Sequence, residues 1–66
     1  MQIELNGEPT EVEDTLPMAR LIATLALVGQ RIAVEVTGEL VPRSRFDHQL
    51  LRPGDRVEII QAVGGG

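Results

Sequence analysis

The chain has 66 residues, 42% of them hydrophobic, and a formal net charge of −4. A chain this short forms one domain, and its acidity argues against binding to nucleic acids or to anionic membranes, which attract cationic surfaces. It contains no cysteine, which excludes disulfide bonds, thiolate metal sites and a nucleophilic thiol.

Two strands joined by a tight turn are predicted at the start of the chain. Residues 1–5 alternate between apolar and polar side chains, which is typical of a half-buried strand. Asn6 and Gly7 both tolerate a positive φ and therefore predict a hairpin turn. A weaker alternation over residues 10–13 predicts the second strand, and Pro9, which lacks an amide hydrogen, places it at a sheet edge or at a strand start.

A helix is predicted next. Thr15 is expected to cap its first turn, in which Pro17 is tolerated, and Gly29 is expected to end it. The spacing i, i+3, i+4, i+7 places four apolar side chains on one face: Met18, Leu21, Ile22 and Leu25. This stripe predicts a helix that packs on a sheet.

The second half of the chain predicts further strands. Residues 32–37 alternate, and residues 40–41 form a short strand. The core side of the longer strand is expected to carry Ile32, Val34 and Val36. Residues 43–51 are expected to be irregular or to form one helical turn. Three apolar side chains of this segment are expected in the core: Phe46, Leu50 and Leu51.

The last strand, residues 56–62, is expected to present apolar side chains on both faces. If Val57 and Ile59 face the helix, the two-residue period of a strand sends the alternate residues to the opposite, solvated face. Three residues are expected there as a docking patch: Ala33, Ile60 and Ala62. An exposed apolar patch close to the C-terminal end of the chain suits a protein-docking site.

This order of elements predicts an α+β domain with a β-grasp arrangement, in which a mixed sheet of four or five strands packs on one main helix. The domain is expected to cover residues 1–63, followed by a flexible glycine tail, residues 64–66. Glycine has no Cβ, so Gly64 and Gly65 could lie extended in a channel too narrow for side chains. They would carry the carboxyl group of Gly66 into a partner's active site.

No group of residues in the chain has the composition of an active site. His48 is the only histidine, and no glycine-rich loop precedes a helix, as a phosphate site requires. We therefore expect a non-enzyme without a bound cofactor or metal ion. We also expect a soluble, cytoplasmic protein, because no segment could span a bilayer and no signal-peptide pattern begins the chain.

Short motifs in order along the chain resemble one family, the ThiS sulfur carrier proteins of thiamin biosynthesis, which belong to the ubiquitin-like β-grasp superfamily. They are LNGE at 5–8, AVEV at 33–36, VPRS at 41–44, GDRVEI at 54–59 and VGGG at 63–66. The resemblance implies that a ThiF-like adenylyltransferase uses ATP and Mg to adenylate Gly66. A persulfide from a sulfurtransferase would then displace AMP and leave a thiocarboxylate, whose sulfur a ThiG-like thiazole synthase would place in the thiazole ring.

Three alternatives remain open. The small subunit of molybdopterin synthase resembles this chain in fold, terminus and chemistry, but usually has a proline pair where Gln61 and Ala62 stand here, which favours the thiamin pathway. A ubiquitin-like protein modifier would use the same activation of the C-terminus. A β-grasp binding module with a disordered tail would tolerate the loss of Gly65 and Gly66.

Overall fold

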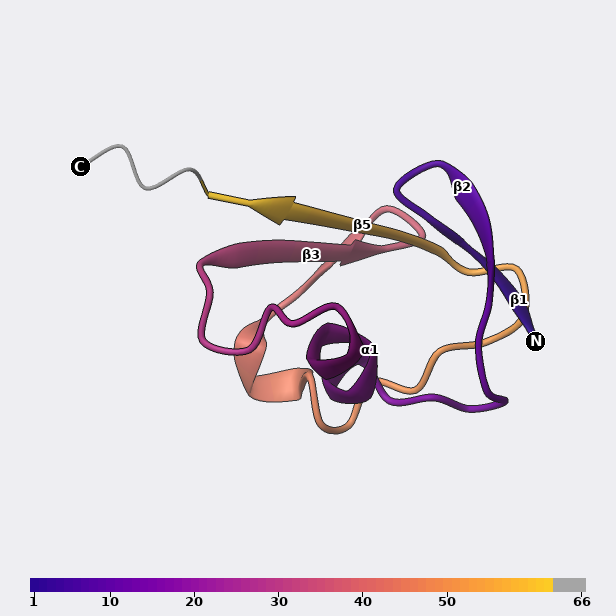
Figure 1. Ribbon diagram of the computed structural model, residues 1–66, viewed down its shortest axis with the longest axis horizontal. Helices are drawn as coiled ribbons and strands as arrows, with labels where there is room; N and C mark the ends of the chain where they lie inside the picture. Colours follow the sequence, from indigo (N-terminus) through magenta and orange to yellow (C-terminus); the bar gives the residue numbers. More distant parts are fainter. Residues whose placement is uncertain (63–66) are drawn as a thin grey trace.

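The computed structural model describes residues 1–62, which form one five-stranded sheet with a helix on one face (Figure 1). The strands are β1 (Gln2–Leu5), β2 (Glu8–Glu11), β3 (Ile32–Val36), β4 (Glu39–Val41) and β5 (Arg56–Gln61). Their order across the sheet is β2-β1-β5-β3-β4. β1 and β5 are parallel and the other neighbours are antiparallel, which confirms the predicted mixed sheet of a β-grasp domain.

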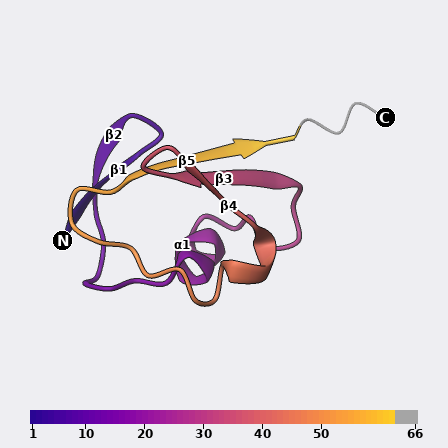
Figure 2. The same ribbon diagram turned by 180° about the vertical axis from the view of Figure 1, so that it is seen from behind.

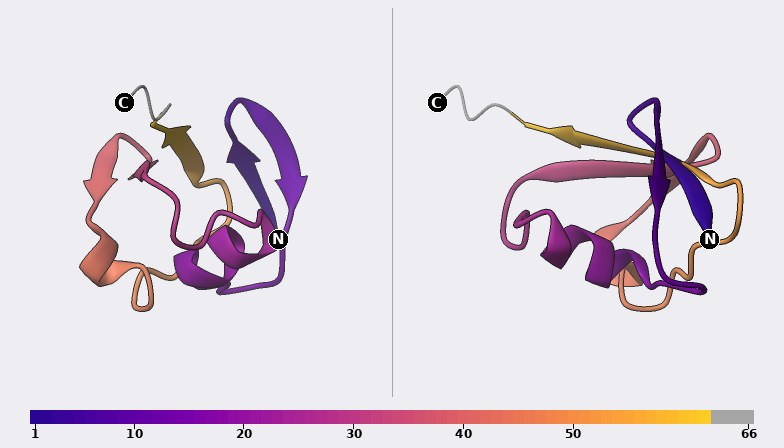
Figure 3. Two further views of the ribbon diagram at one scale, coloured as in Figure 1. Left: turned by 60° about the vertical axis from the view of Figure 1, so that its left-hand side comes forward. Right: turned by 45° about the vertical axis from the view of Figure 1, so that its right-hand side comes forward.

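The core lies between the sheet and helix α1 (Met18–Thr24), which crosses one face of the sheet (Figures 2 and 3). Within residues 1–62, no helix covers the other face. The predicted helix stripe is confirmed for Met18, Leu21 and Ile22, which are buried. The buried apolar residues from the strands and loops are Ile3, Leu16, Val34, Val36, Val41, Leu51, Val57 and Ile59. Ile32 is half-buried against this cluster, on the side predicted for it.

The first hairpin is confirmed. Asn6 and Gly7 have φ values of 49° and 86°, so both turn residues are left-handed, as the two-residue turn between β1 and β2 requires. β2 is an edge strand and includes Pro9, which pairs with Glu4. An edge strand tolerates proline because one of its sides has no neighbour to receive an amide hydrogen bond.

The predicted cap of α1 is wrong. Thr15 has φ 55° and its hydroxyl donates to the Asp14 carbonyl oxygen at 2.6 Å, so it does not face the helix. Pro17 occupies the N-cap position instead. The first-turn N–H groups of Met18 and Ala19 donate to the carbonyl oxygens of Gln49 and Phe46, at 2.8 and 3.0 Å. A distant segment, and not a local side chain, therefore satisfies the start of the helix.

The helix also ends earlier than Gly29, the predicted end. Ala26 adopts a left-handed φ of 60°, and its N–H donates to the carbonyl oxygen of Ala23 at 3.0 Å. The N–H of Leu27 donates to the carbonyl oxygen of Ile22 at 3.0 Å. This pair of hydrogen bonds is a Schellman motif, in which Ala26 occupies the position that glycine normally takes.

The segment after β4 begins with a short 3₁₀ helix, η1 (Arg43–Arg45), which agrees with the predicted single turn. Leu51 is fully buried and Phe46 is half-buried, as expected, but the prediction for Leu50 is wrong because its side chain is 49% exposed. The backbone holds this segment in place through the N–H of Leu51, which donates to the Leu16 carbonyl oxygen at 2.9 Å. The buried Leu51, the half-buried Phe46 and this backbone hydrogen bond therefore anchor the segment.

Candidate functional site

The strand that leads to the C-terminal glycines is the central strand of the sheet. β5 pairs with β1 on one side and with β3 on the other, along the register from Val36↔Val57 to Ile32↔Gln61. The N–H of Ala62 donates to the carbonyl oxygen of Arg31 at 2.8 Å. Hydrogen bonds therefore fix the chain to the sheet as far as Ala62, the last residue that the structure describes.

The two faces of β5 are confirmed as predicted. Val57 and Ile59 are buried beneath α1, at 1% and 9% exposure, whereas Ile60 is 59% exposed on the opposite face of the sheet. Ala62 is exposed as well. The alternation sets the orientation of each side chain, so no other element is needed to turn Ile60 outward.

The three residues predicted as a docking patch lie together. Ala33 of β3 is the cross-strand partner of Ile60, and both line a shallow hollow that Ala62 also lines. The same hollow is lined by Arg31 and Arg43, which add positive charge to its border. We call Ala33, Ile60 and Ala62 the outer patch. Its geometry agrees with a docking surface, and its role stays a prediction.

The three glycines predicted to enter a partner's active site, Gly64, Gly65 and Gly66, lie outside the described residues. Their predicted roles therefore stay predictions, and so does the proposed boundary between domain and tail. The described chain shows where such a tail would start, at the end of β5 and beside the outer patch (Figure 1).

Sequence reasoning assigned Asn6 to a turn and missed a second role. Its Oδ1 atom accepts a hydrogen bond of 2.8 Å from the N–H of Ile59. Because this amide belongs to β5, the hairpin turn helps to fix the strand that carries Ile60. The two residues are 53 positions apart, so no local pattern could have revealed the contact.

The arginines form no ion pairs among the described residues. Within residues 1–62, the ion pairs both belong to the N-terminal ammonium of Met1, which lies 3.1 Å from Asp14 and 3.5 Å from Glu11. Arg43 makes one hydrogen bond there, from Nη2 to the carbonyl oxygen of Gln30 at 3.0 Å. Its guanidinium group therefore keeps further donors for a partner, a feature that composition alone did not reveal.

The N-terminal ammonium has a raised pKa. The hydrogen bond to Asp14 is the largest cause, and the charge of Glu11 acts in the same direction, because both carboxylates stabilise the protonated amine. The ammonium also donates to the carbonyl oxygen of Val12 at 2.7 Å. These contacts tie the start of β1 to the loop that follows β2.

The described part of the chain holds no group of three or more histidine, cysteine, aspartate or glutamate side chains placed to bind a metal ion. None of its helices has the length and apolarity that crossing a membrane requires. His48 is exposed and belongs to no such group within residues 1–62.

Known proteins resemble the chain over its full length. A crystal structure of ThiS from Geobacter metallireducens is 32% identical, matches all of both chains and superposes with a TM-score of 0.85. An uncharacterized protein, ycf40, of Porphyra purpurea is 36% identical over 66 residues, and the match covers 93% of its length. The thiazole synthase of Paramagnetospirillum magneticum is 30% identical over 66 residues, but the chain spans only 20% of that protein.

The ThiS family model matches residues 2–66, so the match includes the outer patch and the terminal glycines. The neighbouring ThiS structure has the same arrangement of strands around one helix, which agrees with the match in sequence. The chain therefore belongs to the ThiS family.

Proposed function

We propose that this chain carries sulfur for thiamin biosynthesis on the carboxyl group of Gly66. The observation that carries the proposal is the match to the ThiS family, which extends through residue 66 and thus includes the glycines that would hold the sulfur. The similarity to a ThiS crystal structure and to a thiazole synthase supports the same pathway. The match also favours the thiamin pathway over molybdopterin synthesis or protein modification.

The chemistry begins with activation of a poor electrophile. The Gly66 carboxylate is ionised at neutral pH, so a nucleophile would have to add to an anion. Attack of a carboxylate oxygen on the α-phosphorus of ATP releases pyrophosphate and gives an acyl-adenylate, from which AMP can leave. ATP and Mg are bound by the adenylating partner in this scheme, and the carrier binds neither.

Sulfur enters from outside the chain, because the chain contains no cysteine. A persulfide sulfur of a sulfurtransferase attacks the carbonyl carbon, and AMP leaves. A second thiol then attacks the acyl disulfide, which releases the Gly66 thiocarboxylate and leaves a disulfide on the donor side. The carrier acts as a co-substrate that is recharged after each transfer, and not as an enzyme. Because the adenylation step consumes ATP, which the cytoplasm supplies, the scheme agrees with a cytoplasmic location of the carrier.

Besides the sulfurtransferase, this scheme requires two protein partners: a ThiF-like adenylyltransferase and a ThiG-like thiazole synthase. The second has support from sequence, because a segment similar to this whole chain makes up a fifth of the Paramagnetospirillum magneticum thiazole synthase. Each of these two partners must bind the folded domain while the C-terminal glycines lie in its active site. The outer patch of Ala33, Ile60 and Ala62 is the proposed binding surface, because it is exposed, apolar and next to the start of the tail.

The test is the intact mass of the chain after incubation with ATP, Mg, the adenylyltransferase and a persulfide donor. The expected result is the exchange of one oxygen for one sulfur, which fragmentation assigns to Gly66. Omission of ATP is the control and is expected to leave the mass unchanged. A mature chain that continues beyond Gly66, or sulfur bound elsewhere, would overturn the proposal.

Variants of the tail separate the carrier from a binding module. Deletion of Gly65 and Gly66 is expected to abolish thiocarboxylate formation while the thermal unfolding curve stays unchanged. Gly65→Val is expected to block adenylation, because a branched side chain cannot enter a channel shaped for glycine. Normal adenylation of the valine variant would contradict the narrow channel, and activity of the truncated chain would contradict the carrier role itself.

A further inference from the structure

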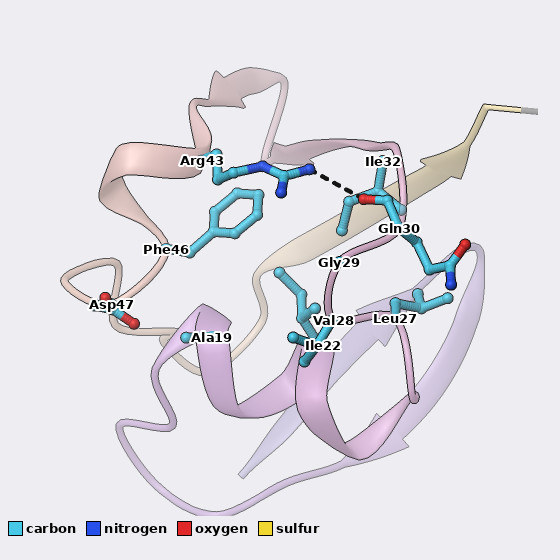
Figure 4. A pocket seen from close by; sticks show the side chains of 10 residues that line it. All are labelled: Ala19, Ile22, Leu27, Val28, Gly29, Gln30, Ile32, Arg43, Phe46 and Asp47. Carbon is cyan, nitrogen blue, oxygen red and sulfur yellow. Dashed lines mark hydrogen bonds between the residues drawn. The ribbon is translucent and has the colours of Figure 1, made fainter.

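A second hollow lies next to the outer patch, on the helix side of the sheet. It has a volume of about 220 Å³ and lies between the end of α1, the loop before β3 and the segment after η1 (Figure 4). Most of its lining is apolar, and its principal side chains are Ile22, Leu27, Val28, Ile32, Arg43 and Phe46. We call it the Phe46 hollow.

The hollow exists because α1 ends early. The left-handed residues Ala26 and Gly29, with φ of 60° and 80°, turn the loop before β3 away from the axis of the helix. A hydrogen bond from the Arg43 side chain to the carbonyl oxygen of Gln30 joins this loop to the η1 segment across the mouth of the hollow (Figure 4). Val28 is 70% exposed and Phe46 is half-buried, so apolar surface is left uncovered on both sides of the gap.

The size of the hollow narrows the class of occupant. Sites for small-molecule ligands and cofactors usually have volumes of about 300–1,000 Å³, so about 220 Å³ is small for a nucleotide or a thiamin precursor. A pocket below that range suits a single apolar side chain. Protein interfaces commonly concentrate their binding energy where one such side chain fills a pocket.

The charge at the mouth indicates what should flank that side chain. Arg43 lines the hollow, forms no ion pair within residues 1–62, and uses one hydrogen bond there to hold Gln30. Asp47 also lines the hollow but lies at the end away from Gln30 (Figure 4). A guanidinium group with free donors binds a carboxylate strongly, since two parallel hydrogen bonds can form.

The Phe46 hollow and the outer patch are parts of one continuous surface. Ile32 and Arg43 line both the Phe46 hollow and the shallow hollow of the outer patch. A partner that contacts Ile60 while it binds the C-terminal glycines therefore lies within reach of Val28 and Phe46. The surface wraps from the outer face of the sheet around the start of β3 to the end of α1.

We propose that thiazole synthase inserts one aliphatic or aromatic side chain, flanked by a carboxylate, into the Phe46 hollow. Thiazole synthase is chosen because one such protein contains a segment similar to this entire chain. The inference rests on the proposed function, which makes that enzyme the acceptor of the sulfur. In this inference the enzyme contacts two places on the domain: the outer patch and, on the helix side of the sheet, the Phe46 hollow.

The test is isothermal titration of the full chain with the thiazole synthase of the same organism. Val28→Asp places a carboxylate at the mouth and is expected to weaken binding by about tenfold or more. Its side chain is 70% exposed, so thermal unfolding is expected to stay unchanged. Leu50→Asp is the matched control, because Leu50 is 49% exposed and lines a different hollow, and its affinity is expected to equal that of the unchanged chain.

A second variant tests the charge. Arg43→Gln keeps an amide donor but removes the guanidinium group, and it is expected to weaken binding and to reduce its dependence on salt. Unchanged affinity of Val28→Asp would overturn the inference, and so would an equal loss with Leu50→Asp. If Ile60→Asp weakens binding and Val28→Asp does not, docking is confined to the outer patch.

The failure of this inference can be told apart from failure of the carrier role. A chain that acquires sulfur on Gly66 but shows no binding to thiazole synthase contradicts the docking proposal and leaves the carrier role intact. A chain that binds the enzyme through Val28 but never acquires sulfur contradicts the carrier role.

Discussion

Ile59 and Ile60 are consecutive residues of one strand, with the same side chain and opposite surroundings. Ile59 is 9% exposed and lies in the core with Val34 and Val57, whereas Ile60 is 59% exposed beside Ala33. Their backbones share the same pairing with β3. The difference teaches that the inner face of β5 holds the fold together, while its outer face is available for recognition.

The sharpest way to break this comparison is to truncate each isoleucine. Ile59→Ala is expected to lower the free energy of unfolding by about 2–4 kcal/mol, because it leaves a cavity in the core. Ile60→Ala is expected to change it by no more than about 0.5 kcal/mol, since its side chain is mostly in water. Urea denaturation followed by circular dichroism measures both values.

For partner binding, substitution of Ile60 is expected to matter more than it does for folding. Ile60→Asp is expected to weaken the binding of the adenylyltransferase or the thiazole synthase more than it weakens folding. Equal losses in folding and binding would mean that Ile60 belongs to the core, and that the two faces of β5 do not divide these tasks.

The second prediction concerns the hydrogen bond that joins the hairpin turn to the backbone of Ile59. Asn6→Gly preserves the left-handed turn but removes the oxygen that accepts the 2.8 Å hydrogen bond from the N–H of Ile59. The free energy of unfolding is expected to fall by about 1–2 kcal/mol, because a partly buried amide loses its acceptor. Asn6→Asp keeps both an acceptor and tolerance of a positive φ, so it is expected to stay near the unchanged chain. Equal urea midpoints for the two variants would show that the bond contributes nothing.

Local sequence patterns were enough to predict the sheet and its two faces. A strand has a period of two residues, so placing Val57 inward decided where Ile60 would point. The hairpin turn at Asn6 and Gly7 was equally local, because left-handed φ values favour those residue types. These features depend on neighbours in the chain, and such neighbours are visible in one sequence.

The misassigned features depend on residues far apart in the chain. The start of α1 is satisfied by the carbonyl oxygens of Phe46 and Gln49, so the expected cap at Thr15 was not needed. The Phe46 hollow likewise arises where the η1 segment meets the loop before β3. No periodicity marks such a meeting point. The candidate site was therefore predicted at the outer patch and missed on the helix side.

The third prediction concerns an exposed residue whose backbone conformation is expected to lower the stability of the fold. Ala26 holds a left-handed φ of 60°, which costs an alanine roughly 1–2 kcal/mol and glycine little. After the greater flexibility of glycine in the unfolded chain is subtracted, Ala26→Gly is expected to raise the free energy of unfolding by about 0.5–1 kcal/mol. The melting temperature is expected to rise by roughly 2–8 °C.

The matched control is Ala23→Gly, the same change at an exposed position inside α1. There it is expected to destabilise the chain by about 1 kcal/mol, because alanine favours the helix interior. A destabilising effect at both positions would contradict the left-handed strain at Ala26. The pair sharpens the comparison of faces, because it shows that at exposed positions the backbone conformation, and not burial, sets the sign of the change in stability.

The smallest expected effect lies at the opposite end of the sheet, where the Met1 ammonium is paired with Asp14 and Glu11. Its pKa is raised above the usual value near 8, so the folded state holds this proton more tightly than the unfolded state. The resulting stabilisation is fully present below about pH 8 and is lost as the pH rises through the folded pKa. The midpoint of urea denaturation is therefore expected to fall over the pH interval between the unfolded and the folded pKa, which begins near pH 8.

The composition of the chain makes this a clean measurement. The chain contains no lysine, tyrosine or cysteine, so no other side chain ordinarily titrates in that interval. Asp14→Asn removes the largest cause of the raised pKa and is expected to flatten the dependence on pH. A midpoint that falls equally in both proteins would show that Asp14 does not hold the proton. A flat profile in the unchanged chain would show that the N-terminal ion pairs add nothing to stability.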